Sequence, residues 1–242
     1  MSPAPVEPIN DAIFSPMPKF DPRAVPVFSI DVDLPAVAPA QLTAAALRIR
    51  FGAPPIWEPE VRVEPLFADR IPAAAAVLIP IVLRDEPTVL LTRRTMHLST
   101  HSGQVAFPGG RVDEGDASVA AAALREAYEE VGLPAHFIEV LGNLPTYTTG
   151  TSFIVTPVVA LVQPGFELAL NAYEVAESFE IPLAFLMNPA HHQRHRMAWD
   201  SANGRREQRE WFSMPYQDGC HERYVWGATA GMLRNLYRFL SA

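Results

Sequence analysis

The chain has 242 residues, of which 49% are hydrophobic and 19% charged, and its formal net charge is -8. This composition supplies enough apolar surface for a folded core and argues against a basic nucleic-acid-binding surface. The single cysteine, Cys220, excludes an intrachain disulfide and a cysteine-built zinc site. The longest apolar run, residues 73–83, is too short to span a membrane, and the N-terminus lacks a signal-peptide pattern. We therefore expect a cytoplasmic protein with no nucleic-acid or membrane partner.

Prolines divide the first part of the chain into two segments. Residues 1–37 are rich in proline, which forbids long helices and central strands. We predict an extended arm that is flexible or draped over a partner, and a homodimer formed through it is a hypothesis. Residues 38–69 predict a helix, over 41–51 and ended by Gly52, followed by a proline-containing linker. The main domain is expected over residues 70–242.

The main domain alternates between strand and helix patterns. Two apolar runs, 75–83 and 88–94, predict strands joined by a polar turn, and a short strand over 104–107 is broken by Pro108-Gly109-Gly110. A loop over 111–116 then leads to Ser118 and a strong helix, Val119–Val131, which Gly132 ends. Further strands are predicted at 138–141, 154–162, 179–181 and 211–214, and a closing amphipathic helix at 226–240.

The predicted helix over 119–131 gathers negative charge on one face. Glu129 and Glu130 lie three and four residues after Glu126, so the three carboxylates share a face. Arg125 is four residues before Glu129 and pairs with it across one turn, but the remaining charge calls for a cation. Oxygen-only ligands select a hard ion such as Mg²⁺ or Mn²⁺. Such an ion neutralises phosphate oxygens and acidifies a bound water, which is the chemistry needed to attack a phosphoanhydride.

The segment from Gly109 to Leu133 resembles the Nudix box, and its second half, REAYEEVGL, matches that pattern closely. The resemblance implies metal ligation by Glu126, Glu129 and Glu130 with the Gly110 carbonyl nearby, and an Arg125 that orients a carboxylate by ion pairing. It also implies an α/β fold, the Nudix α/β/α sandwich with a mixed β-sheet. The first half has one residue more than the pattern. The position of the outer glutamate is therefore Asp116 when residues are counted forward from Gly110, and Ala117 when they are counted back from Arg125.

The preceding residues, Leu90 to Asp113, resemble the signature of coenzyme A pyrophosphatases within this family. Thr95 replaces a serine of that signature, and Ser99 replaces an arginine whose charge would meet a phosphate. Arg93, His97 or His101 are candidates to replace that charge in part. The resemblance implies hydrolysis of the diphosphate linkage of coenzyme A, giving 3',5'-ADP and 4'-phosphopantetheine. The residues expected to bind this small nucleotide substrate are Arg93, Arg94, Phe107 and Gly109.

Two questions stay open at this stage. Catalysis requires a general base, and both Glu129 on the helix and Glu174 in a later loop are candidates, with Arg125 as a supporting catalytic residue. The function also has alternatives: hydrolysis of another nucleoside diphosphate derivative such as ADP-ribose, or a ligand-sensing protein that keeps the fold without catalysis. Two departures from the family patterns, Ser99 and the extra residue near Asp116, are compatible with these alternatives.

Overall fold

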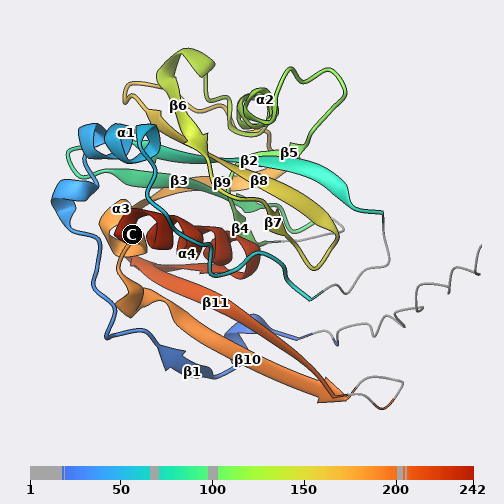
Figure 1. The fold of residues 1–242 in the computed structure, drawn as a ribbon. Helices are drawn as coiled ribbons and strands as arrows, with labels where there is room; N and C mark the ends of the chain where they lie inside the picture. Colours follow the sequence, from blue (N-terminus) through green and yellow to red (C-terminus); the bar gives the residue numbers. More distant parts are fainter. Residues whose placement is uncertain (1–17, 19, 66–70, 98–102, 201–203, 205) are drawn as a thin grey trace, which may run out of the picture.

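The computed structural model describes Pro18 and Gly204 together with residues 20–65, 71–97, 103–200 and 206–242. A mixed sheet with strand order β4-β3-β2-β8-β6 forms the centre, and β5, β7 and β9 extend it. One helix, α2, covers one face of this sheet, and α4 covers the other (Figure 1). This arrangement confirms the predicted α/β/α sandwich with a mixed sheet. The elements of this part are β2 Ala73–Val82, β3 Thr88–Arg94, β4 Val105–Ala106, β5 Gly109–Arg111, α2 Val119–Val131, β6 Ile138–Asn143, β7 Tyr147–Thr148, β8 Phe153–Val162, β9 Val175–Pro182 and α4 Gly227–Ser241.

The central strands are buried on both faces because each face carries its own helix. β2 and β8 run parallel over their whole length, and every residue of β2 from Leu78 onward is either fully buried or nearly so. Alternate side chains divide between two cores. Leu78 and Val82 pack with α2, whereas Ile79 and Ile81 pack on the side of α4. The long apolar run of β2 therefore reflects burial on both faces, as is usual for parallel strands.

Helix α2 has the bounds predicted from its sequence. Ser118 caps its N-terminus by accepting a hydrogen bond from the Ala121 N–H at 3.1 Å. Gly132 ends the helix in the left-handed conformation, with φ of 70°, and its N–H reaches the Tyr128 carbonyl. Alanines dominate the buried side of α2, so the helix approaches β2 and β8 closely. Local signals at both ends thus fix the element that carries the acidic face.

A second, four-stranded antiparallel sheet was largely missed by the sequence patterns. Its order is β1-β10-β11-β12, and it lies against α4 on the side away from the central sheet (Figure 1). The strand predicted over 211–214 is in fact β11, Arg206–Asp218, which continues through Pro215. Proline is tolerated there because pairing with β10 ends at Ser213, so β11 has a neighbour on one side only. The other strands are β1 Val27–Ile30, β10 Gln193–Asp200 and β12 His221–Trp226.

The described part of the N-terminal segment is extended, as predicted, but it packs against the rest of the same chain. After a 3-10 turn, η1 Pro22–Ala24, strand β1 forms the edge of the second sheet beside β10. The described residues of this segment thus pair with the chain's own second sheet, which differs from an arm that is flexible or draped over a partner. The predicted helix of the next segment is α1 Ala44–Gly52, after a 3-10 turn η2 Pro39–Gln41, and its Leu47 reaches the main core. The remaining short helices are η3 Ala135–Phe137, α3 Leu183–Leu186 and η4 Pro189–His191.

A buried ionic network joins α4 to the N-terminal segments. The Arg234 guanidinium, 1% exposed, contacts Asp31 at 2.8 Å and Glu60 at 2.7 Å. It also donates to Nδ1 of His192 at 3.2 Å, and the Leu186 carbonyl lies 2.8 Å from the other ring nitrogen, Nε2. Nδ1 must therefore accept and Nε2 must donate, which is the hydrogen-bonding pattern of a neutral imidazole. Burial, with Arg234 adding to it, lowers the pKa of His192 to about 4.

This neutral histidine predicts a loss of stability in acid. The unfolded chain takes up a proton near the ordinary histidine pKa of 6.5, whereas the folded chain does not until about 4. The stability is therefore fully present above pH 6.5 and falls as the pH drops toward 4. We expect the free energy of unfolding to fall by about 2 kcal/mol more between pH 7.5 and pH 5 in the wild type than in His192→Gln.

Urea unfolding at the two pH values measures this difference. His136→Gln is the matched control because His136 is exposed, and it should keep the wild-type pH dependence. An equal loss in the wild type and in His192→Gln would contradict the assignment.

Candidate active site

The acidic face of α2 lies against the glycine turn that connects β4 to β5. Within this face, Glu130 is buried, Glu126 is partly buried, and Glu129 lies at the rim with 55% of its side chain exposed. The three glutamates therefore share a side of the helix, as predicted, but differ in their environments. Glu126 and Glu130 point toward the glycine turn, and Glu129 remains open to solvent.

The two glycines of the turn are required by close contact. A Cβ on Gly109 would lie 2.4 Å from the Ala76 carbonyl oxygen, so the chain passes too near β2 for a side chain. Its N–H donates to Oε2 of Glu130 at 3.2 Å. A Cβ on Gly110 would lie 2.5 Å from the carboxyl carbon of Glu126. The missing side chains leave room for both carboxylates, and the turn forms a short strand, β5, rather than a simple break.

Arg125 holds the rim of the site together. Its Nε and Nη2 donate to the two carboxylate oxygens of Asp116 at 3.0 and 2.9 Å. Its Nη1 donates to Glu126 at 3.0 Å and to Glu129 at 3.2 Å. The bond to Arg125 lowers the pKa of Asp116 to about 2. Of the two candidate positions in the loop with the extra residue, Asp116 therefore supplies the carboxylate that orients Arg125.

Negative charge is crowded at the centre of the site. Burial raises the pKa of Glu130 to about 7; the Gly109 N–H and Arg94 oppose the shift, and Glu174 and Glu126 reinforce it. Burial likewise raises the pKa of Glu126, with Arg125 opposing it and Glu129 and Glu174 adding to it. The cation within reach of Glu130 is Arg94, whose Nη1 is 3.6 Å from Oε1. The charged forms of both glutamates are therefore disfavoured until further positive charge arrives.

Glu174 comes to the same place from a distant part of the sequence. The segment before β9 crosses the C-terminal end of α2, where the Asn171 N–H donates to the Glu130 carbonyl at 2.9 Å. The Glu174 carbonyl accepts from the Thr95 N–H at 2.9 Å, just after β3 ends. The Thr95 hydroxyl adds a bond to the Tyr173 carbonyl at 2.9 Å. Thr95 thus fastens the loop that brings Glu174 to the carboxylates of α2.

The structure separates the residues expected to bind substrate. Arg94 faces Glu130, but its neighbour Arg93 points to the other face of β3 and pairs with Glu177 at 2.7 Å. Phe107 is 3% exposed and packs in the core on the side of α4, so its predicted substrate contact is not supported. Its side chain instead anchors the start of the glycine turn. Ser99 and His101 lie outside the described residues, and His97 contacts the Tyr173 ring at 5.0 Å.

The donor set fits a hard divalent cation. Two buried or partly buried carboxylates, Glu126 and Glu130, converge on the glycine turn with oxygen atoms alone, and burial raises the pKa of both although Arg125 and Arg94 oppose the shift. Within the described residues, no three histidine, cysteine or acidic side chains are already drawn together as a complete cage. A pair of carboxylates can hold Mg²⁺, because that ion keeps several waters and commonly bridges to substrate phosphates.

The segment containing this site matches a known protein family. The model of the NUDIX domain matches residues 72–212, which is more than half of the chain and includes β2, the glycine turn and α2. The chain belongs to the Nudix family. Family members act on nucleoside diphosphate derivatives and generally use divalent metal ions, so this protein is a Nudix pyrophosphohydrolase.

Curated relatives carry the same family name. Proteins named uncharacterized Nudix hydrolase NudL are 45% identical over 162 residues in Enterobacter sp. (strain 638), covering 67% of this chain and 80% of the relative. In Shigella flexneri serotype 5b (strain 8401), the identity is 45% over 182 residues, covering 75% and 88%. In Escherichia coli O1:K1 / APEC, it is 47% over 163 residues, covering 67% and 80%.

Solved structures with similarity to this Nudix protein include a binary complex of a C. elegans Ap4A hydrolase. It is 21% identical with a TM-score of 0.41, and the match covers 48% of this chain and 85% of that one. Another is the NUDIX domain of Shewanella oneidensis NrtR complexed with ADP ribose. It is 21% identical with a TM-score of 0.38, covering 48% and 75%.

Asp116 is the site residue of this Nudix protein whose role the sequence left undecided. From the sequence, Asp116 and Ala117 are both candidates for the outer glutamate position, because the loop has one extra residue. Its position in the sequence could have identified it: Asp116 lies nine residues before Arg125, where the loop returns to the helix. Within the described residues, none of the helices is long and apolar enough to cross a membrane.

The bidentate pair between Arg125 and Asp116 predicts a specific effect of Arg125→Lys. Lysine keeps the charge but loses the planar fork that holds Asp116, Glu126 and Glu129 together. We expect kcat to fall by about 10- to 100-fold, the usual effect of losing a group that orients metal ligands. Steady-state kinetics measure it, with Arg238→Lys on the exposed side of α4 as the control. Wild-type kcat in Arg125→Lys would contradict this role.

Proposed function

We propose that this Nudix hydrolase cleaves the diphosphate linkage of coenzyme A or its derivatives, giving 3',5'-ADP and 4'-phosphopantetheine. One observation carries the proposal. Two residues of the segment from Leu90 to Asp113, which resembles the coenzyme A pyrophosphatase signature, contact the same carboxylate. Arg94, near its start, faces Glu130, and Gly109, near its end, donates its N–H to Glu130. The signature and the acidic helix thus form one site.

The proposed site divides the work among its residues. Glu126, Glu129 and Glu130 hold Mg²⁺ or Mn²⁺, with the Gly110 carbonyl beside them. The bound ion supplies charge neutralisation of the diphosphate and a more acidic water. Arg94 orients a phosphate oxygen through its guanidinium, because a quarter of its side chain is exposed beside Glu130. Gly109 holds the Glu130 carboxylate in place through its N–H.

For the general base, the geometry favours Glu174 over Glu129. Glu129 is mostly exposed and already accepts a hydrogen bond from Arg125. Glu174 lies close enough to Glu126 and Glu130 to raise the pKa of both, and its backbone is held by Thr95. A base near this cluster can take the proton of the attacking water. Glu174→Gln should then lower kcat sharply at neutral pH, whereas Glu129→Gln should change chiefly the metal dependence.

An activity panel with Mg²⁺ and Mn²⁺ tests the substrate. It compares coenzyme A, acetylated coenzyme A and ADP-ribose at equal concentration, using the wild type and Glu126→Gln. The proposal predicts that kcat/KM is highest for a coenzyme A form and that the variant loses this activity. Rapid turnover of ADP-ribose without turnover of coenzyme A would make the enzyme a hydrolase of another nucleoside diphosphate derivative. Equal residual turnover in both proteins would show that the activity is not from this site.

A homodimer stays a prediction, now with a candidate contact. β1 forms the edge of the second sheet, and its Val27, Phe28 and Ile30 are each more than a third exposed. An edge strand with apolar side chains can pair with a second copy. Light scattering of the wild type and of Phe28→Lys measures the mass in solution. A monomeric mass for the wild type would contradict the predicted homodimer.

A further inference from the structure

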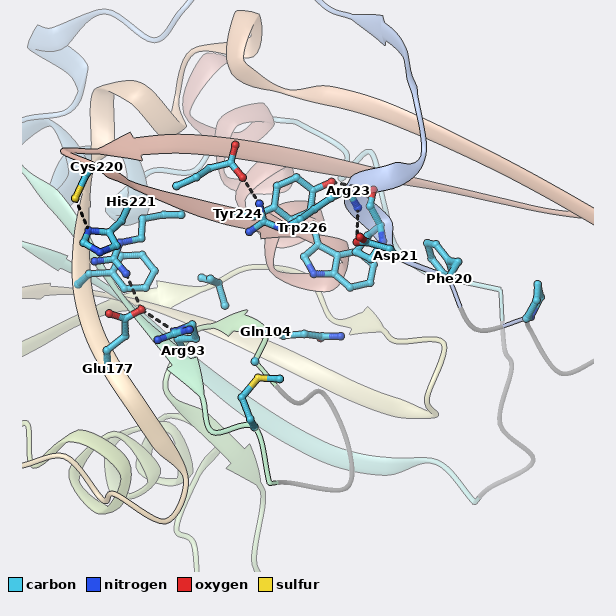
Figure 2. A pocket seen from close by; sticks show the side chains of 18 residues that line it. Phe20, Asp21, Arg23, Arg93, Gln104, Glu177, Cys220, His221, Tyr224 and Trp226 are labelled. Carbon is cyan, nitrogen blue, oxygen red and sulfur yellow. Dashed lines mark hydrogen bonds and ion pairs between the residues drawn. The ribbon is translucent and has the colours of Figure 1, made fainter.

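A cavity of about 1170 Å³ lies on the other side of the sheet edge from the carboxylates of α2. Its walls come from three places: the N-terminal segment around Phe20, the ends of β3, β4 and β9, and strand β12 (Figure 2). Arg93 on β3 lines it, and the next residue, Arg94, faces Glu130. The cavity and the proposed catalytic site therefore meet at the end of one strand. Its volume is as large as that of sites for drug-sized ligands.

The cavity walls are aromatic and electrically balanced. Phe20, Phe179, Tyr224 and Trp226 line it, and the Phe20 ring lies 6.2 Å from that of Trp226 at a nearly perpendicular angle. The lining charges are paired: Arg93 and Arg223 contact Glu177 at 2.7 and 2.6 Å, and Arg23 pairs with Glu222. Paired charges leave little net field to attract a multiply charged anion. The surface suits a flat, polar ring that stacks on aromatic faces and forms hydrogen bonds at its edge.

The N-terminal wall is fixed in place by the chain itself. The Asp21 carboxylate caps the turn η1 by accepting from the Arg23 N–H at 3.0 Å. The Tyr224 hydroxyl donates to the Pro22 carbonyl at 3.2 Å, and the Arg23 guanidinium lies over the Tyr224 ring at 4.5 Å. The Phe20 ring also contacts Trp211 at 5.3 Å. This wall lies outside residues 72–212, which match the family model, so it is an addition to the shared domain.

We propose that this cavity binds the nucleobase end of the substrate, with Phe20 as a stacking residue supplied by the N-terminal segment. The inference rests on the proposed function, because it places the diphosphate at the carboxylates of α2. A substrate that occupies both places passes around the end of β3, from Arg94 on one face to Arg93 on the other. The N-terminal segment would then set the specificity for the base while the family domain performs the hydrolysis.

Binding of the product 3',5'-ADP in EDTA tests the cavity without any turnover. The intrinsic fluorescence of Trp226 and Trp211 reports binding, because both rings adjoin Phe20. We expect saturable quenching in the wild type and a Kd about 10-fold weaker in Phe20→Ala, the effect of losing one base-stacking ring. Phe20→Tyr, which keeps a ring, should stay within about 2-fold of the wild type. Val32→Ala is the control, since Val32 belongs to the same segment, is exposed and does not line the cavity.

The outcomes separate this inference from the proposed function. Equal affinity for 3',5'-ADP in the wild type and Phe20→Ala, or no saturable binding at all, would overturn the inference. Tight binding of 4'-phosphopantetheine that depends on Phe20 would also overturn it, because that ligand has no base. If coenzyme A is not hydrolysed but Phe20-dependent binding of 3',5'-ADP persists, the proposed function fails and the cavity assignment stands. If coenzyme A is hydrolysed with the same KM in Phe20→Ala as in the wild type, the proposed function stands and the cavity assignment fails.

Discussion

Replacing Glu130 by glutamine is expected to lower kcat by about 100-fold or more while making the metal-free protein more stable at pH 8. Glutamine has the same shape and can still accept the Gly109 N–H, but it removes a negative charge that the proposed cation requires. The loss of activity follows because a neutral amide is a weak ligand for a hard ion.

The gain in stability follows from the sign of the pKa shift. Burial raises the pKa of Glu130 from 4.5 to about 7, so the folded chain disfavours the charged carboxylate. The wild type therefore loses stability as the pH rises from 4.5 toward 7, by up to about 3 kcal/mol, and the glutamine variant does not. Added Mn²⁺ should restore stability to the wild type alone, because it offsets that charge.

Thermal unfolding at pH 5 and pH 8, with and without Mn²⁺, measures both effects beside kcat. Glu86→Gln, in the exposed turn between β2 and β3, is the control and should change neither quantity. A Glu130→Gln protein that keeps its activity, or that is less stable than the wild type at pH 8 without metal, would contradict the assignment of Glu130.

Gly110→Ala is expected to remove activity through a single methyl group. The added Cβ would lie 2.5 to 2.6 Å from the atoms of the Glu126 carboxylate, so that carboxylate must move away from the turn. We expect kcat to fall by about 100-fold and the affinity for Mn²⁺ to weaken, because a ligand leaves its position. Calorimetric titration with Mn²⁺ and steady-state kinetics measure the two effects.

Two further variants make this result specific. Gly115→Ala changes a glycine of the following loop whose Cβ would meet nothing within 4 Å, and it should behave as the wild type. Glu126→Asp in the Gly110→Ala background shortens the displaced side chain and should recover part of the Mn²⁺ affinity. Unchanged Mn²⁺ binding in Gly110→Ala would show that the Glu126 carboxylate does not take part.

The sequence predicts the helix of this site well because its signals are local. Ser118 and Gly132 mark the ends of α2, and the spacing of its glutamates is a property of any helix. The meeting of Arg94 with Glu130, and of Glu174 with Glu130, depends on how β3, α2 and the segment before β9 pack. No local pattern contains those contacts, although the alternation of β3 could have shown that Arg93 and Arg94 face opposite sides.

The second sheet was missed for a different physical reason. Along β10, polar and charged residues such as Arg194 and Arg196 make ion pairs instead of alternating with a clear apolar face. Pro215 in β11 is a strong strand-breaking signal. The strand tolerates it because β11 pairs with β10 only as far as Ser213, so no β10 residue needs an N–H from Pro215. The role of β1 depends in turn on β10, so the N-terminal segment could not be placed from its prolines alone.

Hydrolysis of coenzyme A in heavy-oxygen water, followed by mass spectrometry of the products, tests the central claim most directly. The reaction contains Mg²⁺ or Mn²⁺ and the full chain, with Glu130→Gln as the inactive comparison. We expect 3',5'-ADP and 4'-phosphopantetheine in equal amounts, with one heavy oxygen on one of the two phosphates, and neither product from the variant. Intact coenzyme A, or the same products from the variant at the wild-type rate, would contradict it.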